Sequence, residues 1–102
     1  MIFSNLITMK FRLERATDGK HKWIGVFTDK DTERRVPFGA KGYEDYTQHH
    51  NPLRKENYLL RHRAREDWKD PMTAGALSRW ILWEYPSLDR SVREFKRRFS
   101  LE

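Results

Sequence analysis

The stretch KFRLERATDGKHKWIGVFTDKDTERRVPF (residues 10–38) decides the fold, because short apolar-rich runs alternate in it with polar turn sequences. Over residues 10–14, apolar and charged residues alternate, which is typical of a strand with one buried face. The run at 23–28 is rich in aromatic and β-branched residues, which favour strands. A third strand is expected at 34–38, at a sheet edge because Pro37 lacks an amide donor. The stretch therefore predicts an antiparallel meander of about three strands.

The sequence after this stretch predicts helices separated by prolines. Asn51 is a good N-cap for a helix over Pro52–Arg65, with proline at its first position. Asp70 followed by proline repeats the device and predicts a second, most buried helix over Pro71–Tyr85. Ser87 caps a last helix, whose apolar stripe consists of Leu88, Val92, Phe95 and Phe99.

These elements predict an α+β fold, a small antiparallel meander of about three strands followed by about three helices packed on it. A chain of 102 residues is expected to form a single domain over 1–102. It divides into an apolar N-terminal arm (1–9), the meander (10–38) and a helical part (43–99). The arm is interpreted as a docking segment or a first strand, since it is too short to span a bilayer.

The composition points to a binding protein with an anionic partner. Lys and Arg total 21 against 15 Asp and Glu, which gives a formal net charge of +6 and a pI near 9.8. Such an excess attracts polyanions, although it also serves solubility alone in many basic proteins. The absence of cysteine excludes disulfides, zinc-thiolate sites and thiol catalysis.

Basic side chains gather on two of the predicted helices. The helix from Pro52 places Arg54, Tyr58, Arg61 and Arg65 on one stripe, and the last helix places Arg90, Arg93 and Arg97 opposite its apolar stripe. Guanidinium groups interleaved with an aromatic ring suit phosphate contacts and base stacking. Two other interpretations stay open, a solvated helix face partly paired with nearby carboxylates and a seam against an acidic protein.

A cluster of metal-ligand residue types consists of Asp45, His49, His50, His62 and Glu66. His62 and Glu66 are four residues apart on a predicted helix, and imidazole with carboxylate can hold a divalent ion. A strand pair followed by these residues faintly resembles the ββα-metal nucleases, but the spacing of His50 and His62 fits that pattern badly. Capping and ion pairing are the more usual roles for such residues, so no metal site and no cofactor are predicted.

Other catalytic signals are absent from the sequence, which has no nucleophile elbow, no Gly-rich phosphate loop and no HExxH motif. Of the tryptophans, Trp80 and Trp83 are expected in the core because their spacing is helical. Trp68 lies in a polar stretch and is expected to be exposed or interfacial. The sequence therefore predicts no catalytic residues and no small-molecule substrate.

Four blocks of the chain are specific enough to carry a resemblance: FGAKGYEDYTQHH (38–50), RKENYLLRH (54–62), RAREDW (63–68) and MTAGALSRWILW (72–83). In this order they resemble a family of small uncharacterised proteins of large nucleocytoplasmic DNA viruses, over roughly residues 22–99. No activity comes with the resemblance, which implies a viral protein. The polar residues matching the blocks are Tyr43, Asp45, Tyr46, Thr47, His49, Arg61, His62, Arg65, Glu66, Asp67, Ser78 and Arg79.

Together the charge and the resemblance predict a non-enzymatic virion component, a minor capsid or core protein. Its basic helices would meet the genome or acidic surfaces of other viral structural proteins, in the virion and in the host cytoplasm or nucleus during infection. A free, sequence-independent nucleic-acid-binding protein is the alternative, and a metal-dependent nuclease through His49, His50, His62 and Glu66 a remote one.

Overall fold

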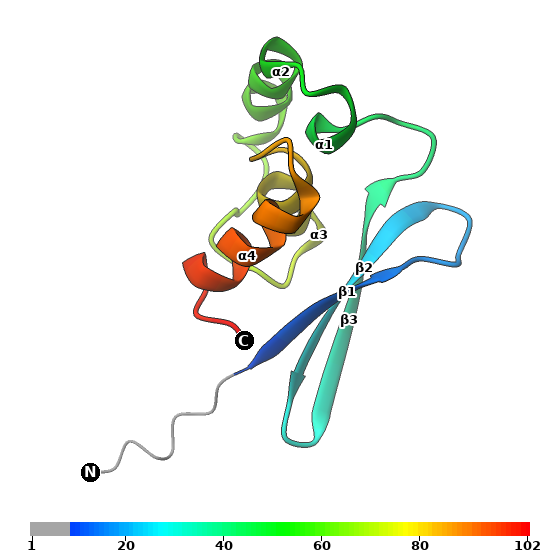
Figure 1. Cartoon of the computed structure of the whole chain (residues 1–102), viewed down its shortest axis with the longest axis vertical. Coiled ribbons are helices and arrows are strands. Elements are labelled where there is room, and N and C mark those ends of the chain that lie inside the picture. Colours follow the sequence, from blue (N-terminus) through cyan, green and yellow to red (C-terminus); the bar gives the residue numbers. More distant parts are fainter. Residues whose placement is uncertain (1–8) are drawn as a thin grey trace.

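The computed structural model of the protein describes residues 9–102 (Figure 1). It confirms the α+β class, a three-stranded meander followed by helices packed against it. In chain order the elements are β1 (Lys10–Arg15), β2 (His21–Asp29), β3 (Thr32–Ala40), α1 (Tyr46–His49), α2 (Pro52–His62), α3 (Ala74–Leu77), the π-helix η2 (Ser78–Leu82) and α4 (Leu88–Arg98). Residues 1–8 of the predicted N-terminal arm lie outside the described residues.

The sheet has the order β1-β2-β3, and both strand pairs are antiparallel. Phe11 pairs with Phe27 across the first ladder, and Trp23 pairs with Phe38 across the second. Pro37 lies in β3, which forms an edge of the sheet, as the missing amide of proline requires. The strand predicted at 23–28 extends two residues further at its start and one at its end, and the strand predicted at 34–38 extends two residues further at each end. The reason is that the ladders also include the polar flanks of the apolar runs.

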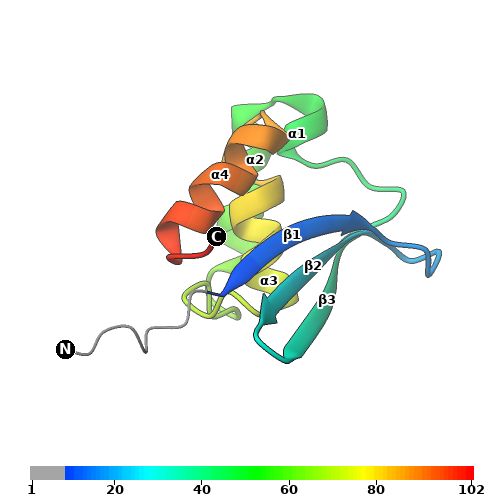
Figure 2. The same cartoon turned by 60° about the horizontal axis from the view of Figure 1, so that its bottom comes forward.

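The helices cover one face of this sheet, and the core lies between the two layers (Figure 2). The buried cluster contains Phe11, Phe27, Phe38, Leu77, Ile81, Leu82 and Phe95. The ring of Phe11 lies 5.0 Å from that of Phe27 and 4.8 Å from that of Phe95, so α4 packs directly on the sheet. Aromatic rings bury large apolar areas, which lets a chain with few hydrophobic residues still form a core.

The two layers approach each other closely at Gly25 of β2. A Cβ at this position would lie 3.0 Å from Cδ1 of Leu77 and 3.1 Å from Cε1 of Phe11. A side chain here would push α3 off the sheet, so glycine sets the distance between the layers.

The predicted helix over Pro71–Tyr85 is wrong at both ends, since the helical segment runs from Ala74 to Leu82, and in its geometry. The Asp70 carboxylate accepts the Met72 amide hydrogen at 3.0 Å and holds a turn, while the Thr73 hydroxyl caps α3 by accepting from the Ala76 amide at 3.1 Å. The helix therefore begins at Ala74, and it continues as the π-helix η2 rather than as an α-helix. The Pro52 helix is correctly capped by Asn51 but ends at His62, three residues early.

The helical part begins with α1 and ends with α4, after which the chain returns to the sheet. The short helix α1 is not predicted by the sequence pattern, and it forms because Asp45 and Gln48 make a capping box. The α4 helix begins as predicted, with the Ser87 hydroxyl accepting from the Arg90 amide. After α4 the chain returns to β1, where the Phe11 amide donates to the Glu102 carbonyl at 2.7 Å. Among the described helices, none is long and apolar enough to cross a membrane.

Candidate functional site

The arginines of α4 face outward because the opposite side of this helix is fixed in the core. Ser91 and Phe95 are fully buried, and the side of the helix away from them carries Arg90, Arg93 and Arg97, all exposed. Arg97 is 81% exposed, and its contact to Glu94 at 3.3 Å is a weak surface pair. Arg90 lies 4.1 Å over the ring of Tyr85. Their positive charge is therefore available to another molecule.

The arginines of the α2 region divide into paired and free groups. Arg54 forms an ion pair with Glu44 at 3.0 Å. Arg61 and Arg65 are exposed, and within residues 9–102 neither forms an ion pair. Glu66, a carboxylate that was a candidate to neutralise this stripe, instead accepts hydrogen bonds from His62 and Trp68.

Tyr58, predicted to stack on a base or contact a partner, is placed inside the protein. Only 7% of the residue is exposed, and its ring stacks on Trp83 at 4.3 Å and on His62 at 4.2 Å. Burial, together with the nearby carboxylate of Glu66, raises the pKa of the Tyr58 hydroxyl far above its usual value. Both faces of the ring are already occupied, so the prediction of base stacking by Tyr58 is wrong.

The sheet offers less free positive charge than the helices. On its exposed face Glu14 pairs with both Arg35 and Arg12, and Arg35 also contacts Glu33 at 3.2 Å. The hydrogen bond from Arg35, followed by that from Arg12, lowers the pKa of the Glu14 carboxyl. Arg12 and Arg35 are therefore engaged by carboxylates and belong to a mixed-charge surface.

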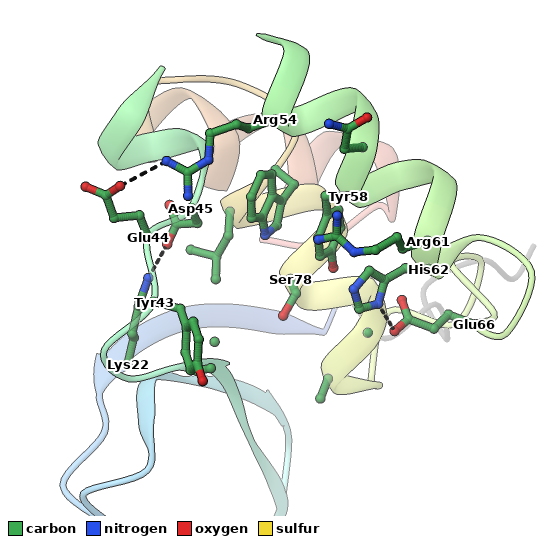
Figure 3. A pocket seen from close by; sticks show the side chains of 17 residues that line it. Lys22, Tyr43, Glu44, Asp45, Arg54, Tyr58, Arg61, His62, Glu66 and Ser78 are labelled. Atoms are coloured by element: carbon green, nitrogen blue, oxygen red, sulfur yellow. Dashed lines mark hydrogen bonds and ion pairs between the residues drawn. The ribbon is translucent and has the colours of Figure 1, made fainter. Parts of the chain in front are cut away.

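An open pocket of about 690 Å³ lies between α2, the segment 43–45 and the α3–η2 helix (Figure 3). Several polar residues of the sequence blocks meet there, although they lie far apart in the chain. They are Tyr43, Asp45, Arg61, His62, Glu66 and Ser78. The π-helix η2 forms one wall, and such rare helices frequently occur at functional sites. The blocks therefore come together at one place in the fold.

Most charged groups of the pocket are paired with one another. The Lys22 ammonium lies 2.7 Å from Asp45, and the Nδ1 atom of His62 lies 3.0 Å from Glu66. Arg54 is held by Glu44, as described above. In this part of the described chain, Arg61 is a pocket cation without an acidic partner, and Figure 3 shows its guanidinium in front of the Tyr58 ring.

The predicted cluster of metal-ligand residues is dispersed. Asp45 is buried as the α1 cap, and His50 contacts the Thr47 carbonyl at 3.1 Å. His49 packs its ring 5.3 Å from that of Trp83. His62 pairs with Glu66, and no three carboxylate or imidazole groups of residues 9–102 gather where they could hold a metal ion.

His49 has an internal role in the helical part. Its Nδ1 atom accepts the Asn51 amide hydrogen at 2.9 Å, which leaves the proton on Nε2. Nε2 is buried without a hydrogen-bond partner in the described structure. Burial, with the charge of Arg54 second, lowers the pKa of His49, so the ring is neutral at physiological pH.

The other aromatic and basic residues singled out in the sequence also make internal contacts. Arg79 lies 4.1 Å over the Trp80 ring, and its guanidinium donates to Glu84 at 2.6 Å. Tyr46 packs beside His49. Trp68, expected to be exposed or interfacial, is half-buried, and its indole donates to Glu66 at 2.8 Å. Trp80 and Trp83 pack against the core as predicted.

A protein-family model described as a family of unknown function (DUF5754) matches residues 11–62. The chain belongs to this family. The DUF5754 match covers the sheet, α1 and α2, so it includes one side of the pocket, and the side formed by α3 and η2 lies outside it. No curated protein and no solved structure matches the chain significantly.

Sequence reasoning missed polar residues that shape the pocket, and it assigned Trp83 to the core alone. Lys22 comes from β2 and Asn57 from the middle of α2, while Trp83 follows η2. Lys22 and Asn57 lie among many similar polar residues, and nothing in their sequence context distinguishes them. Trp83 was expected in the core, and it serves both the core and the pocket wall.

Proposed function

We propose that this protein is a non-enzymatic, sequence-independent nucleic-acid-binding protein that uses the exposed arginines of α4. The observation that carries the proposal is the outward row of Arg90, Arg93 and Arg97 on a helix anchored in the core by Phe95. Over Leu88–Arg98 the helix has five basic and two acidic side chains. A rigid basic helix of this kind suits the phosphate backbone, which attracts cations regardless of sequence.

The α2 region supplies a smaller share of the same function. Arg65 is exposed and unpaired in the described structure, whereas Arg54 is engaged by Glu44 and Tyr58 is buried. Phosphate contacts by Arg65 would add electrostatic affinity without base reading. The proposal therefore rests on α4 first and on Arg65 second.

The resemblance to small proteins of large DNA viruses supports a finer proposal, in which the nucleic acid is a viral genome and the protein is packaged with it as a minor capsid or core component. Mass spectrometry of purified particles of the encoding virus, with copy-number estimation, tests this part. Many copies per particle are expected, and absence from the particles would exclude packaging while leaving nucleic-acid binding untouched.

The binding itself is tested by fluorescence anisotropy with a labelled DNA duplex of mixed sequence, titrated over a range of salt concentrations. The variant combines Arg90→Gln, Arg93→Gln and Arg97→Gln. Losing about three phosphate contacts should weaken binding and flatten the slope of log K against log salt by about 2 to 3.

A matched control combines Lys30→Gln, Arg34→Gln and Lys41→Gln, which are exposed basic residues in and beside the sheet. It removes the same net charge far from α4, so its salt slope should change by much less. Equal effects of the two triple variants would show that only net charge matters, and would overturn the assignment to α4.

A further inference from the structure

The hydrogen-bonding groups of the pocket are unequally satisfied. Its carboxylates are already engaged, since Glu44 accepts from Arg54, Asp45 from Lys22 and Thr47, and Glu66 from His62 and Trp68. Several donor side chains facing the same space have no hydrogen-bond partner within residues 9–102. They are Tyr43, Asn57, Tyr58, Arg61 and Ser78.

The free donors come from three separate parts of the chain and surround one space. Tyr43 is 75% exposed at the end of the sheet, Ser78 begins η2, and Arg61 reaches in from α2 (Figure 3). Tyr58, like any tyrosine, keeps its hydroxyl proton at neutral pH, so it also remains a donor. A ligand that completes this arrangement must bring acceptors, and it must compensate the charge of Arg61.

We infer that the pocket binds a phosphate group carried by a small organic molecule or by a nucleic-acid strand. A phosphate group offers three acceptor oxygens in different directions, which suits donors arranged around a space better than the two coplanar oxygens of a carboxylate. The guanidinium of Arg61 would engage it through two parallel hydrogen bonds.

The size and the walls of the pocket extend the inference to the rest of the ligand. A volume of about 690 Å³ lies within the ordinary range for small-molecule sites and exceeds the needs of a phosphate group alone. The wall beside the donors is apolar or aromatic, with Leu82 and Trp83. A nucleotide, with a phosphate for Arg61 and a nucleoside that occupies the remaining volume beside this wall, has the matching chemistry.

The inference does not depend on the proposed function, because no residue of α4 is among those that line the pocket. The test is an NMR titration of the full-length ¹⁵N-labelled protein with inorganic phosphate, adenosine 5′-monophosphate and adenosine. Shifts are expected at the amides of Gly75, Ser78 and Arg61 with both phosphate-bearing probes. Binding should be weaker for adenosine, which lacks the phosphate.

The variants compare Arg61, which lines the pocket, with Arg34, which is also exposed but does not line it. Arg61→Gln should weaken binding of adenosine 5′-monophosphate by about tenfold or more, because it removes a charge-assisted pair of hydrogen bonds. Arg34→Gln in β3, which removes an exposed arginine outside the pocket lining, should leave this affinity unchanged. Ser78→Ala, which removes one neutral donor, should give a smaller loss of a few fold.

A strand carrying a 5′-phosphate, compared with the same strand without it, distinguishes the two sources of the phosphate. Stronger pocket shifts with the phosphorylated strand than with the mononucleotide assign the site to strand ends, and the reverse result assigns it to free nucleotides. Absence of pocket shifts with every phosphate-bearing probe, or equal affinities of wild type and Arg61→Gln, would overturn the inference. Duplex binding through α4 would persist in that case, so the two failures are distinguishable.

Discussion

The helices α2 and α4 have the same length of 11 residues and a similar basic character, yet they are attached to the protein in different ways. In α4, Ser91 and Phe95 are buried, and Leu88, Val92 and the C-cap residue Phe99 also pack on the core. In α2 only Tyr58 is buried, while Leu53 and Leu60 are 66% and 55% exposed. The positive charge of α4 thus lies on a helix of the core, whereas that of α2 lies on a helix that is held at the surface by one buried side chain.

The difference bears on function because an exposed face of a core helix and the wall of a pocket suit different kinds of ligand. The arginines of α4 point away from the core and into solvent, which suits an extended polyanion. Arg61 of α2 lines a pocket of mixed polar groups, which suits a small ligand. Substitutions that loosen each helix separately should therefore affect the two proposed binding activities separately.

Phe95→Ala should have the largest effect on stability, because it removes the aromatic ring that joins α4 to Phe11 and Phe27. A loss of about 3–5 kcal/mol is expected for truncating a buried aromatic residue. This is a large fraction of the stability of a small domain, so unfolding should be global. Urea denaturation followed by circular dichroism measures it.

The matched control is Leu60→Ala on the outer side of α2, where a change within about 0.5 kcal/mol is expected for an exposed side chain. If Phe95→Ala lowered the free energy of unfolding by less than about 1 kcal/mol, α4 would not be the core element that the packing indicates.

Tyr58→Ala should have the next largest effect, and its effect should be local. Removing the ring from between Trp83 and His62 should destabilise the attachment of α2 by about 2–3 kcal/mol, from lost burial and stacking. Because α2 contacts little else, its amides should exchange hydrogen much faster while those of α4 stay protected. Hydrogen exchange read by NMR resolves the two helices.

Tyr58→Phe is the control, since it keeps the stacked ring and loses only a hydroxyl that makes no hydrogen bond in the described structure. It should retain protection in α2. Equal loss of protection in α2 and α4 after Tyr58→Ala would mean that the helices unfold as one unit, and the comparison would fail.

The sequence was sufficient for the elements that bury a regular apolar pattern. The alternation over 10–14 and the stripe of Leu88, Val92, Phe95 and Phe99 predicted β1 and α4, because burial alone fixes such elements. Boundaries decided by competing caps were harder to predict. Asp70 and Thr73 are both good caps, and only the three-dimensional hydrogen bonds show that Thr73 begins the helix.

The sequence predicted several residues of the candidate site, but it did not predict which of them lie together in the fold. The outward row on α4 followed from helical periodicity, whereas the pocket joins β2, the 43–45 segment, α2 and η2, whose proximity depends on the tertiary fold. Tyr58 was misassigned because a tyrosine within a basic stripe has the same pattern whether its ring faces solvent or Trp83. Periodicity defines a face of a helix, and packing decides what that face meets.

The smallest predicted effect concerns Glu84, which links the two helical regions. Its carboxylate lies 2.6 Å from the Arg79 guanidinium and 3.6 Å from the Lys55 ammonium of α2, and Lys55 also donates to the Glu84 carbonyl at 2.8 Å. Burial raises the pKa of the Glu84 carboxyl, and the contacts with Arg79 and Lys55 outweigh it, so the pKa lies below its ordinary value. Glu84→Gln should therefore lower stability at neutral pH by about 1 kcal/mol.

The pH dependence of this loss separates charge from packing. A carboxyl whose pKa is lower in the folded than in the unfolded state stabilises the fold fully above its unfolded pKa, and this stabilisation is lost as pH falls through the folded value. Urea denaturation should thus distinguish wild type from Glu84→Gln at neutral pH, and the difference should shrink below about pH 4. The control Glu33→Gln, which breaks an exposed pair with Arg35, should have little effect at any pH. A difference at Glu84 that stayed constant with pH would show that shape rather than charge holds α2 against η2, leaving the Tyr58 stack as its main attachment.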